Sequence, residues 1–307
     1  MKTASFNGVW VAMVSPWDAE RHAPRRDVLE RFVTRLADAG VAGLYVLGTT
    51  GEGTLLSPPE REKFAETVLD ISADRLPVIV HTGHDRTEAA CALSRHAGKS
   101  GAAAVAVAPP CRYRLDEEAL RAHYLEIASA IGDLPLFLYD IPSTTGNPLS
   151  GRLLAVLRSQ ASNVVGAKIS RGDWEAWEEY LELADEACLL VGKDEMGFPL
   201  LTMGGSGLVS SCANVFPELY VALYRAAERS AHDQGRRLQM LIIELCRVMR
   251  RGHVPTIKWA LTRMGWDVGL PLSPLVPVSP EEGATIDAQF TALKERIEQL
   301  IGKGGGG

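Results

Sequence analysis

The chain has 307 residues, of which 46% are hydrophobic and 23% are charged, a composition that fits a globular protein with a sizeable core. Its formal net charge of -6 gives it no electrostatic reason to bind nucleic acid or an anionic membrane. The sequence has no apolar run long enough to cross a bilayer, and its first residues lack the apolar core of a signal peptide, so we expect a cytoplasmic protein.

Eight short apolar segments recur along the chain, alternating with segments of helical periodicity. The strand-like segments are 8–14, 43–47, 77–81, 102–108, 134–139, 164–169, 187–191 and 207–211. The helix-like segments are 26–39, 58–71, 87–99, 116–131, 149–160 and 173–184, and another begins at 215–218. Near-continuous apolar strands that alternate with helices indicate parallel pairing. Eight such units predict a closed (β/α)8 TIM barrel, the catalytic domain, over residues 1–229.

After residue 229 the strand-like segments stop and helical patterns take over. Segments 232–251, 255–264 and 280–301 are helical by pattern, and a proline-rich stretch at 271–277 joins the last two. We therefore predict a C-terminal helical extension over 230–302, which packs on the barrel or on another subunit. The glycine-rich end, 303–307, is predicted to be a flexible tail.

Two strand ends offer groups suited to an acidic carbonyl substrate, at the end of a barrel where active sites gather. The second strand runs into Gly48-Thr49-Thr50-Gly51-Glu52-Gly53, whose backbone N–H groups and hydroxyls can hold a carboxylate. The fifth strand ends in Tyr139, which can donate or accept a proton at the mouth of the barrel. Each pattern alone is also compatible with an ordinary turn and an ordinary packed tyrosine.

Lys168 lies at the end of the sixth strand, in Val164-Val165-Gly166-Ala167-Lys168-Ile169. A lysine buried there must lose its proton or find a partner, and a neutral lysine is a nucleophile toward ketones. The alternative is a strand-end lysine that reaches into water. Because Tyr139 is on the adjacent strand and the threonine turn can bind a carboxylate, the combination predicts an imine with a 2-oxo acid such as pyruvate. Such an imine makes the adjacent carbon acidic for aldol cleavage, condensation or elimination.

These motifs resemble those of the dihydrodipicolinate synthase/N-acetylneuraminate lyase family, class I aldolases that form a Schiff base. The matching segments, in order and spacing over residues 7 to 300, are Gly48-Thr49-Thr50-Gly51-Glu52, Tyr139-Asp140-Ile141-Pro142, Gly166-Ala167-Lys168, Gly192-Lys193-Asp194-Glu195 and Gly204-Gly205-Ser206-Gly207. The resemblance implies a TIM barrel with a helical C-terminal extension that assembles as a homo-oligomer, a tetramer or dimer.

The resemblance also implies roles for individual residues. Lys168 forms the imine, Tyr139 shuttles protons, and Thr49 relays protons to the tyrosine. Thr50, in the turn that begins at Gly48, would bind the substrate carboxylate together with that turn, and the backbone at Val209 would line the pyruvate site. We expect no cofactor and no metal, since the His-x-x-His pattern at 81–84 has no third ligand nearby.

Three positions depart from the family pattern and bear on the substrate. Thr144, at a substrate-binding position, stands where the synthases carry an arginine that binds a substrate carboxylate, and a threonine cannot replace a bidentate guanidinium. Asp140 replaces an asparagine; near Lys168 it would favour the ammonium form, or it faces away and caps a loop. Cys111 or Arg112 takes the place of a tyrosine that reaches a neighbouring subunit's site in the family.

Three cations near strand ends, Arg112, Arg171 and Lys193, can bind a second carboxylate or an acidic sugar, although each alone is more often a solvated surface charge. The leading hypothesis is a Schiff-base lyase, an aldolase or a dehydratase, acting on pyruvate or a related 2-oxo acid, in particular a 2-oxo sugar acid. One alternative is 4-hydroxy-tetrahydrodipicolinate synthase, and another is a non-catalytic protein that senses a 2-oxo acid. A third is a phosphate-binding barrel enzyme, although the glycine-rich segment 204–207 precedes the eighth strand and the usual anion site follows it.

Overall fold

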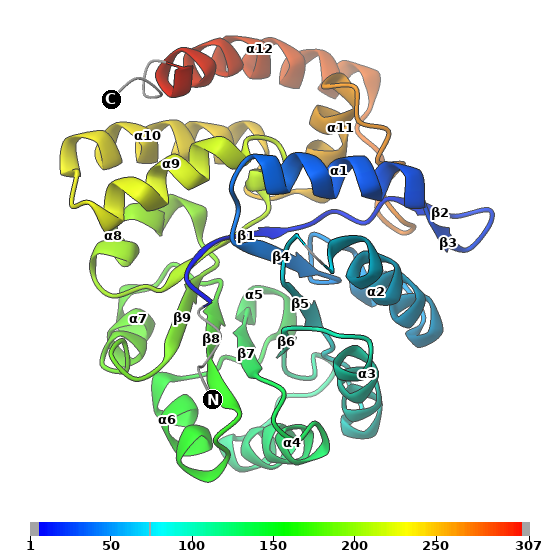
Figure 1. The fold of residues 1–307 in the computed structure, drawn as a ribbon, viewed down its shortest axis with the longest axis vertical. Helices are drawn as coiled ribbons and strands as arrows, with labels where there is room; N and C mark the ends of the chain where they lie inside the picture. Colours follow the sequence, from blue (N-terminus) through cyan, green and yellow to red (C-terminus); the bar gives the residue numbers. More distant parts are fainter. Residues whose placement is uncertain (1–5, 74, 303–307) are drawn as a thin grey trace.

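The computed structural model describes residues 6–73 and 75–302, and at its centre is a closed barrel of parallel strands (Figure 1). Around the ring the order is β1, β10, β9, β8, β7, β6, β5, β4. The strands are β1 (Gly8–Ala12), β4 (Gly43–Val46), β5 (Val78–His81), β6 (Ala104–Val107), β7 (Leu136–Asp140), β8 (Val164–Ile169), β9 (Cys188–Val191) and β10 (Gly207–Ser210). The predicted TIM barrel is confirmed, and each predicted strand segment overlaps an observed strand.

Helices follow the strands and lie outside the ring (Figure 1). They are α1 (Arg26–Asp38), α2 (Pro58–Ser72), α3 (Thr87–Lys99), α4 (Glu117–Ala130), α6 (Gly151–Gln160), α7 (Trp174–Leu181) and α9 (Pro217–Glu228). Local signals set their starts: α2 begins at a capping box formed by Ser57 and Glu60, and the Asp116 side chain accepts the N–H of Ala119 at the start of α4. The pair β2 (Trp17–Asp18) and β3 (Ala23–Pro24), and the short helices α5 (Pro142–Thr145) and α8 (Gly197–Thr202), were not predicted, because such short elements establish no period.

Strand alternation decides which side chains enter the barrel, because successive residues of a strand point to opposite faces. The inner cluster contains Trp10, Ala12, Tyr45, Ile79, Ala104, Ala106, Phe137, Tyr139, Leu190 and Val209. In β8, Ala167 and Ile169 belong to the layer between strands and helices, so Lys168 between them points inward. Tyr139 lies opposite Lys168 in the pairing of β7 with β8, whereas Asp140, next along β7, points outward.

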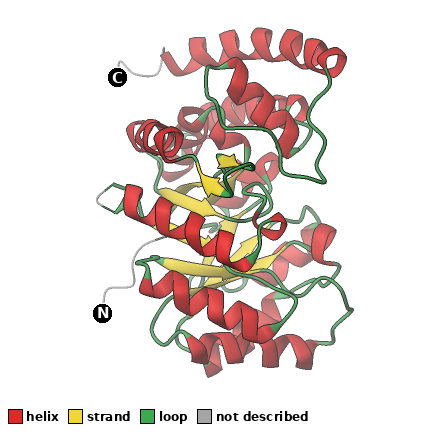
Figure 2. Cartoon of the chain, turned by 90° about the vertical axis from the view of Figure 1, so that its right-hand side faces the viewer, coloured by secondary structure: helices red, strands yellow, loops and turns green. Residues whose placement is uncertain are grey.

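The C-terminal part of the described chain is helical, as predicted, and consists of α10 (His232–Val248), α11 (Val254–Arg263) and α12 (Pro280–Gly302). α10 packs against α9, and α12 lies along both helices at the top of the molecule in Figures 1 and 2. The boundary at residue 229 stays a prediction, and the tail predicted at 303–307 lies outside the described residues. Within residues 6–73 and 75–302, no helix is long and apolar enough to cross a membrane.

Candidate active site

Two adjoining cavities lie at the carboxyl ends of the barrel strands. The smaller has a volume of about 200 Å³ and is called the lysine chamber here, because Lys168 forms part of its wall. The larger, of about 480 Å³, is called the outer cavity. Thr49, Tyr139 and Ile141 line both, so the two cavities meet at these three side chains. Two of the three residues predicted to be catalytic therefore stand at the junction, and the third stands in the chamber.

The amine of Lys168 is buried between two tyrosine rings. The residue is 4% exposed, and its Nζ lies 4.0 Å from the ring centroid of Tyr45 and 4.1 Å from that of Tyr139. Burial lowers the pKa of Lys168 from its ordinary value. Tyr139 opposes this shift, and the charge of Asp194 opposes it to a smaller extent. Lys168 therefore does not reach into water, and its neutral, nucleophilic form is more accessible than in a solvated lysine.

A contact between two hydroxyl groups provides a route for protons beside this amine. The Tyr139 hydroxyl lies 3.4 Å from Oγ1 of Thr49, and either group can be the donor. Tyr139 is buried, whereas Thr49 is exposed to the cavities, so the pair connects the surroundings of the amine with the space that a substrate would fill. The arrangement suits a proton relay to and from a carbonyl carbon attacked by Lys168.

The turn after β4 holds both predicted threonines in a compact geometry. The N–H of Gly53 donates to the carbonyl of Gly48 over 3.3 Å. A Cβ on Gly53 would lie 1.9 Å from the carbonyl oxygen of Leu47, so glycine is required there for the backbone to pass. Gly48 itself lines neither cavity, and its predicted substrate-binding role stays a prediction. Its missing side chain leaves room for the Tyr45 ring, which a Cβ would approach to 2.8 Å.

Three other residues predicted to bind substrate line the lysine chamber. They are Thr50, Val209 and Lys193. Thr50 and Val209 are buried, at 7% and 2% exposure, so their polar and backbone groups face the small chamber and are shielded from bulk solvent. Nζ of Lys193 lies 3.4 Å from the carboxylate of Glu195, and both side chains remain partly exposed. Lys193 therefore supplies a partly exposed cation to the wall of the chamber.

The remaining two predicted binding residues, Thr144 and Arg112, line the outer cavity. Oγ1 of Thr144 donates to the carbonyl of Ile141 over 3.2 Å. The side chain of Arg112 is 76% exposed, and its Nε lies 3.7 Å from the carboxylate of Asp85. Such an exposed pair contributes little to stability, so Arg112 can turn toward an anionic ligand at small cost.

Arg171 does not belong to the site, which corrects the expectation that it could bind a second carboxylate. Its guanidinium pairs with the carboxylate of Asp173, and its Nη1 lies 3.6 Å from that of Asp140. Asp140 faces away from Lys168, as the loop-capping interpretation predicted, and accepts the N–H of Leu149 over 3.0 Å and the hydroxyl of Tyr180 over 3.3 Å. The two residues join β7 and β8 to the surrounding helices.

The burial of Asp140 predicts a pH dependence of stability. Burial raises the pKa of Asp140 to about 6, against the opposing influence of its hydrogen bonds and of Arg171. Because this value exceeds the pKa of unfolded aspartate, the stabilising contribution is complete below the unfolded pKa and is lost as the pH rises through about 6. We expect the free energy of unfolding of Asp140→Asn, relative to the wild type, to increase between pH 4 and pH 7 by up to ~3 kcal/mol. Urea unfolding at both pH values measures this, and a difference independent of pH would contradict it.

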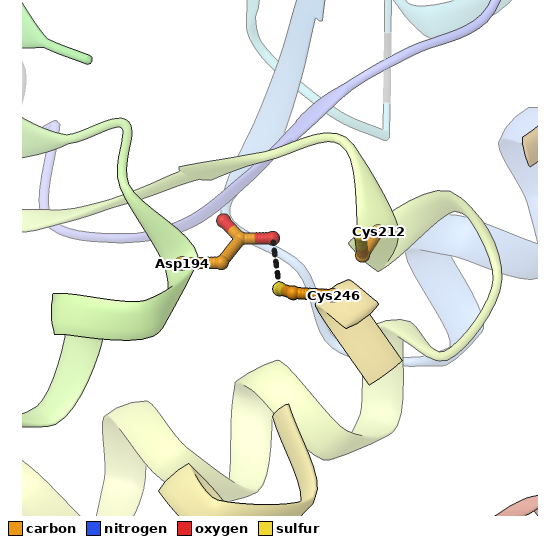
Figure 3. Close-up of side chains that lie close together, drawn as sticks. All are labelled: Asp194, Cys212 and Cys246. Carbon is orange, nitrogen blue, oxygen red and sulfur yellow. Dashed lines mark hydrogen bonds between the residues drawn. The ribbon is translucent and has the colours of Figure 1, made fainter. Parts of the chain in front are cut away.

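Asp194, which begins a short 3-10 helix (Asp194–Met196) after β9, is the centre of a buried polar network, and Figure 3 shows it with Cys212 and Cys246. Its Oδ2 accepts the hydroxyls of Ser210 and Tyr220, both over 2.7 Å, and the thiol of Cys246 over 3.7 Å. Asp194, Cys212 and Cys246 have ligand atoms within 4.8 Å of one another, the spacing of a metal site. However, the carboxylate oxygen already accepts three protein donors, which is the chemistry of a closed hydrogen-bonded network and not of an open metal site.

The His-x-x-His pattern does not form a metal site in the described chain. Nδ1 of His81 lies 3.1 Å from the carbonyl of Leu47, and its Nε2 accepts the N–H of Ala108 over 3.4 Å. Burial lowers the pKa of His81 to about 3, so the imidazole is neutral and both of its nitrogens are used. His84 lines the outer cavity, where its Nδ1 accepts the N–H of Arg86 over 3.0 Å.

The glycine-rich segment 204–207 lies at the amino end of β10, opposite to the cavities. The carbonyl of Ser206 accepts the N–H of Gly8 over 3.2 Å, and its Oγ accepts the N–H of Leu189 over 3.0 Å. These bonds join the starting ends of three neighbouring strands. The segment therefore closes the barrel and gives no support to a phosphate-binding enzyme.

Sequence reasoning missed Tyr45 and assigned no role to Asp194. Tyr45 is in the middle of β4, and the alternation that places Lys168 and Tyr139 inward could have identified it. The sequence analysis named Asp194 only as part of the 192–195 motif. Its role in the network could not be predicted, because its hydrogen-bond partners come from elements that are distant in sequence.

The comparisons with known proteins all point to one family. The model of a family described as the dihydrodipicolinate synthetase family matches residues 5–293. An uncharacterised DapA-like lyase of Halobacterium salinarum is 35% identical over 94% of each chain. A 4-hydroxy-tetrahydrodipicolinate synthase of Methanopyrus kandleri is 34% identical over 88% of this chain and 90% of the relative. Among solved structures, the prophage protein YagE of the dihydrodipicolinic acid synthase family from E. coli K12, in complex with pyruvate, superposes with a TM-score of 0.88 at 25% identity, over 95% of this chain and 99% of that one.

Proposed function

The chain belongs to the dihydrodipicolinate synthetase family and is a lysine Schiff-base lyase, and from this premise we propose that Lys168 forms an imine with pyruvate or a related 2-oxo acid during the turnover of a 2-oxo sugar acid. The observation that supports the proposal most directly is the buried amine of Lys168, placed between Tyr45 and Tyr139 in a chamber of about 200 Å³. The related prophage protein was crystallised with pyruvate, which supports the same ligand class here.

In the proposed mechanism, the neutral amine of Lys168 attacks C2 of the 2-oxo acid and a carbinolamine forms. Tyr139 gives a proton to the departing hydroxyl, water leaves, and a protonated imine remains. Thr49 passes protons between Tyr139 and the cavity, consistent with their contact of 3.4 Å. The hydroxyl of Thr50 and the backbone of the turn hold the substrate carboxylate, so that C2 faces the amine.

The imine serves as the electron sink for carbon chemistry. In aldol cleavage of a 4-hydroxy-2-oxo acid, Tyr139 removes the proton of the C4 hydroxyl, the C3–C4 bond breaks, and its electrons form an enamine on the Lys168 nitrogen. The aldehyde leaves, the enamine takes a proton at C3, and water releases pyruvate and the free amine. Condensation is the same sequence reversed. Dehydration starts from the same imine: C3 loses a proton to give the enamine, and the enamine electrons expel the C4 hydroxyl, which leaves as water with a proton from Tyr139.

The two cavities support a substrate longer than pyruvate. The lysine chamber matches a three-carbon unit, and the adjoining outer cavity of about 480 Å³ leaves room for the rest of a sugar acid. Arg112 supplies a cation to the wall of the outer cavity and Lys193 supplies one to the wall of the lysine chamber. Thr144 offers a hydroxyl where the family's synthases carry an arginine, and a hydroxyl suits a polyol chain better than a second carboxylate.

A second candidate function is 4-hydroxy-tetrahydrodipicolinate synthase, which the name of the Methanopyrus kandleri relative favours. It would require pyruvate to condense with an amino-acid semialdehyde in the outer cavity. The absence of an arginine at position 144 removes the charge pair that recognises such a substrate in the family.

The proposed function is tested by borohydride reduction with pyruvate, followed by peptide mass spectrometry. An adduct on Lys168 is expected, and no adduct with any 2-oxo acid would refute the proposal. A panel of 2-oxo sugar acids, assayed by pyruvate release, then separates the lyase from the synthase, which would instead consume pyruvate with the semialdehyde. Exchange of the pyruvate methyl protons in deuterated water excludes a purely sensory protein, because a sensor would bind without exchange.

Lys193 gives a prediction about the second part of the substrate. Lys193→Met is expected to raise KM for a 2-oxo sugar acid about tenfold, because a charge-assisted hydrogen bond is lost. Arg171→Met is the matched control, since this cation is held by Asp140 and Asp173 away from both cavities, and its KM should remain that of the wild type. Steady-state kinetics of both variants check this, and equal KM values for the two would contradict the assignment.

A further inference from the structure

A buried ion pair joins the C-terminal extension to the turn that contains the two catalytic-site threonines. Nζ of Lys258, in α11, lies 2.5 Å from Oε2 of Glu52, which follows the threonines in the 48–53 turn. The two side chains are 2% and 0% exposed. The pair therefore links parts of the chain that are far apart in sequence through a contact shielded from water.

Backbone groups complete the surroundings of both charges. Oε1 of Glu52 accepts the N–H of Leu272 over 2.6 Å. The Lys258 ammonium donates to the carbonyl of Leu270 over 3.0 Å and to that of Ser15 over 3.4 Å. Buried charges are costly unless they are paired and hydrogen-bonded. These contacts hydrogen-bond the ammonium and Oε1 of Glu52, whereas Oε2 of Glu52 has the ion pair with Lys258 but no hydrogen bond within the described residues.

The network extends into the backbone of the turn. The N–H of Glu52 donates to the carbonyl of Thr49 over 3.1 Å, and Glu52 has a left-handed φ of 53°, which is unfavourable for a residue with a side chain. The hydroxyl of Ser15 donates to the carbonyl of Gly51 over 2.7 Å, while the carbonyl of Ser15 accepts from Lys258. The ammonium is thus connected to the turn by two routes.

Stability alone does not account for such a pair. Replacing a buried ion pair with apolar groups of similar volume is often neutral or stabilising, because desolvation offsets most of the Coulomb attraction. What the pair supplies is a fixed geometry, and the element it fixes is the turn that faces the lysine chamber. The same extension contributes Leu275 to the wall of the outer cavity, so it reaches both parts of the site.

We propose that Lys258 is a positioning residue, which holds the 48–53 turn through Glu52 so that both threonines are aligned with the bound 2-oxo acid. The inference rests on the proposed function, since that function gives the threonines their roles. Through Lys258, the C-terminal extension then contributes to catalysis in addition to any contribution it makes to folding.

The test uses the double variant Glu52→Gln/Lys258→Met, because Lys258→Met alone would leave a buried carboxylate without its partner. We expect KM for pyruvate to rise about tenfold and the rate of methyl-proton exchange to fall about 10- to 100-fold, because small displacements of catalytic groups have effects of this size. Hydrogen exchange of a peptide over 48–56 should become faster. All assays are run well below the measured Tm of each variant.

Two further variants separate positioning from folding. Ile257→Val removes a buried methyl group from the same helix and should lower Tm while leaving KM and the exchange rate unchanged. Ser15→Ala removes only the bond to Gly51 and should raise KM about threefold in a folded protein, so it decides the matter if the double variant does not fold.

The outcomes distinguish the two proposals. Wild-type adduct formation together with unchanged KM and exchange rate in the double variant, whatever its Tm, would overturn the positioning role and leave the proposed function intact. In a fold-defective double variant, an unchanged KM for Ser15→Ala would have the same meaning. Failure of the wild type to trap any 2-oxo acid would overturn both.

Discussion

Replacing Lys168 by methionine is expected to abolish imine formation and to lower kcat by at least about 10⁴-fold, because methionine fills the same space without a nucleophile. The experiment is clearly interpretable, since Lys193, the other lysine that lines the lysine chamber, is partly exposed and pairs with Glu195. The apolar methionine side chain also suits the space between the two tyrosine rings. Borohydride trapping with pyruvate and methyl-proton exchange in deuterated water both measure the loss.

Lys168→Arg is the companion variant, because it keeps a positive charge but cannot form an imine. It should be as inactive as the methionine variant, which would exclude a role for the charge alone. The methionine variant should have a Tm at least equal to that of the wild type, since it removes the cost of burying an amine. An adduct that still forms elsewhere in either variant, with exchange intact, would show that the nucleophile is a different residue.

Tyr139→Phe is expected to lower kcat roughly 10²- to 10³-fold while KM for pyruvate changes little. The ring and its packing remain, and only the hydroxyl that lies 3.4 Å from Thr49 is removed. Imine formation should become slow but still reach completion, so borohydride trapping after long incubation yields the wild-type adduct. A time course of trapping, combined with steady-state kinetics, measures both effects.

Tyr45→Phe provides a matched control for this experiment. Its ring also lies about 4 Å from the Lys168 amine, but its buried hydroxyl has no hydrogen-bond partner in the described part of the chain. Its removal should therefore leave kcat nearly unchanged and can raise stability slightly. Equal losses of kcat in the two variants would mean that the rings, and not the Tyr139 hydroxyl, are what the reaction needs.

Much of the fold and the centre of the site followed from local patterns. Apolar runs with helices between them predicted the barrel, and position at a strand end predicted Lys168 and Tyr139. The expectation that Arg171 could bind a second carboxylate was wrong, because closeness to a strand end along the chain does not give the direction of a side chain. Here the contacts with Asp140 and Asp173 determine that direction. The pairing of Glu52 with Lys258 could not be predicted, since two residues so distant in sequence share no local signal.

The meeting of the lysine chamber and the outer cavity at Thr49, Tyr139 and Ile141 has an evolutionary consequence. Under the proposed function the imine forms in the lysine chamber, whereas Arg112 and Thr144 line the outer cavity alone. Substitutions at these two positions are therefore expected to change the acceptor and to leave the imine chemistry intact. Redesign of its specificity therefore begins with the loops around the outer cavity, where new acceptors can be selected against an unchanged pyruvate donor.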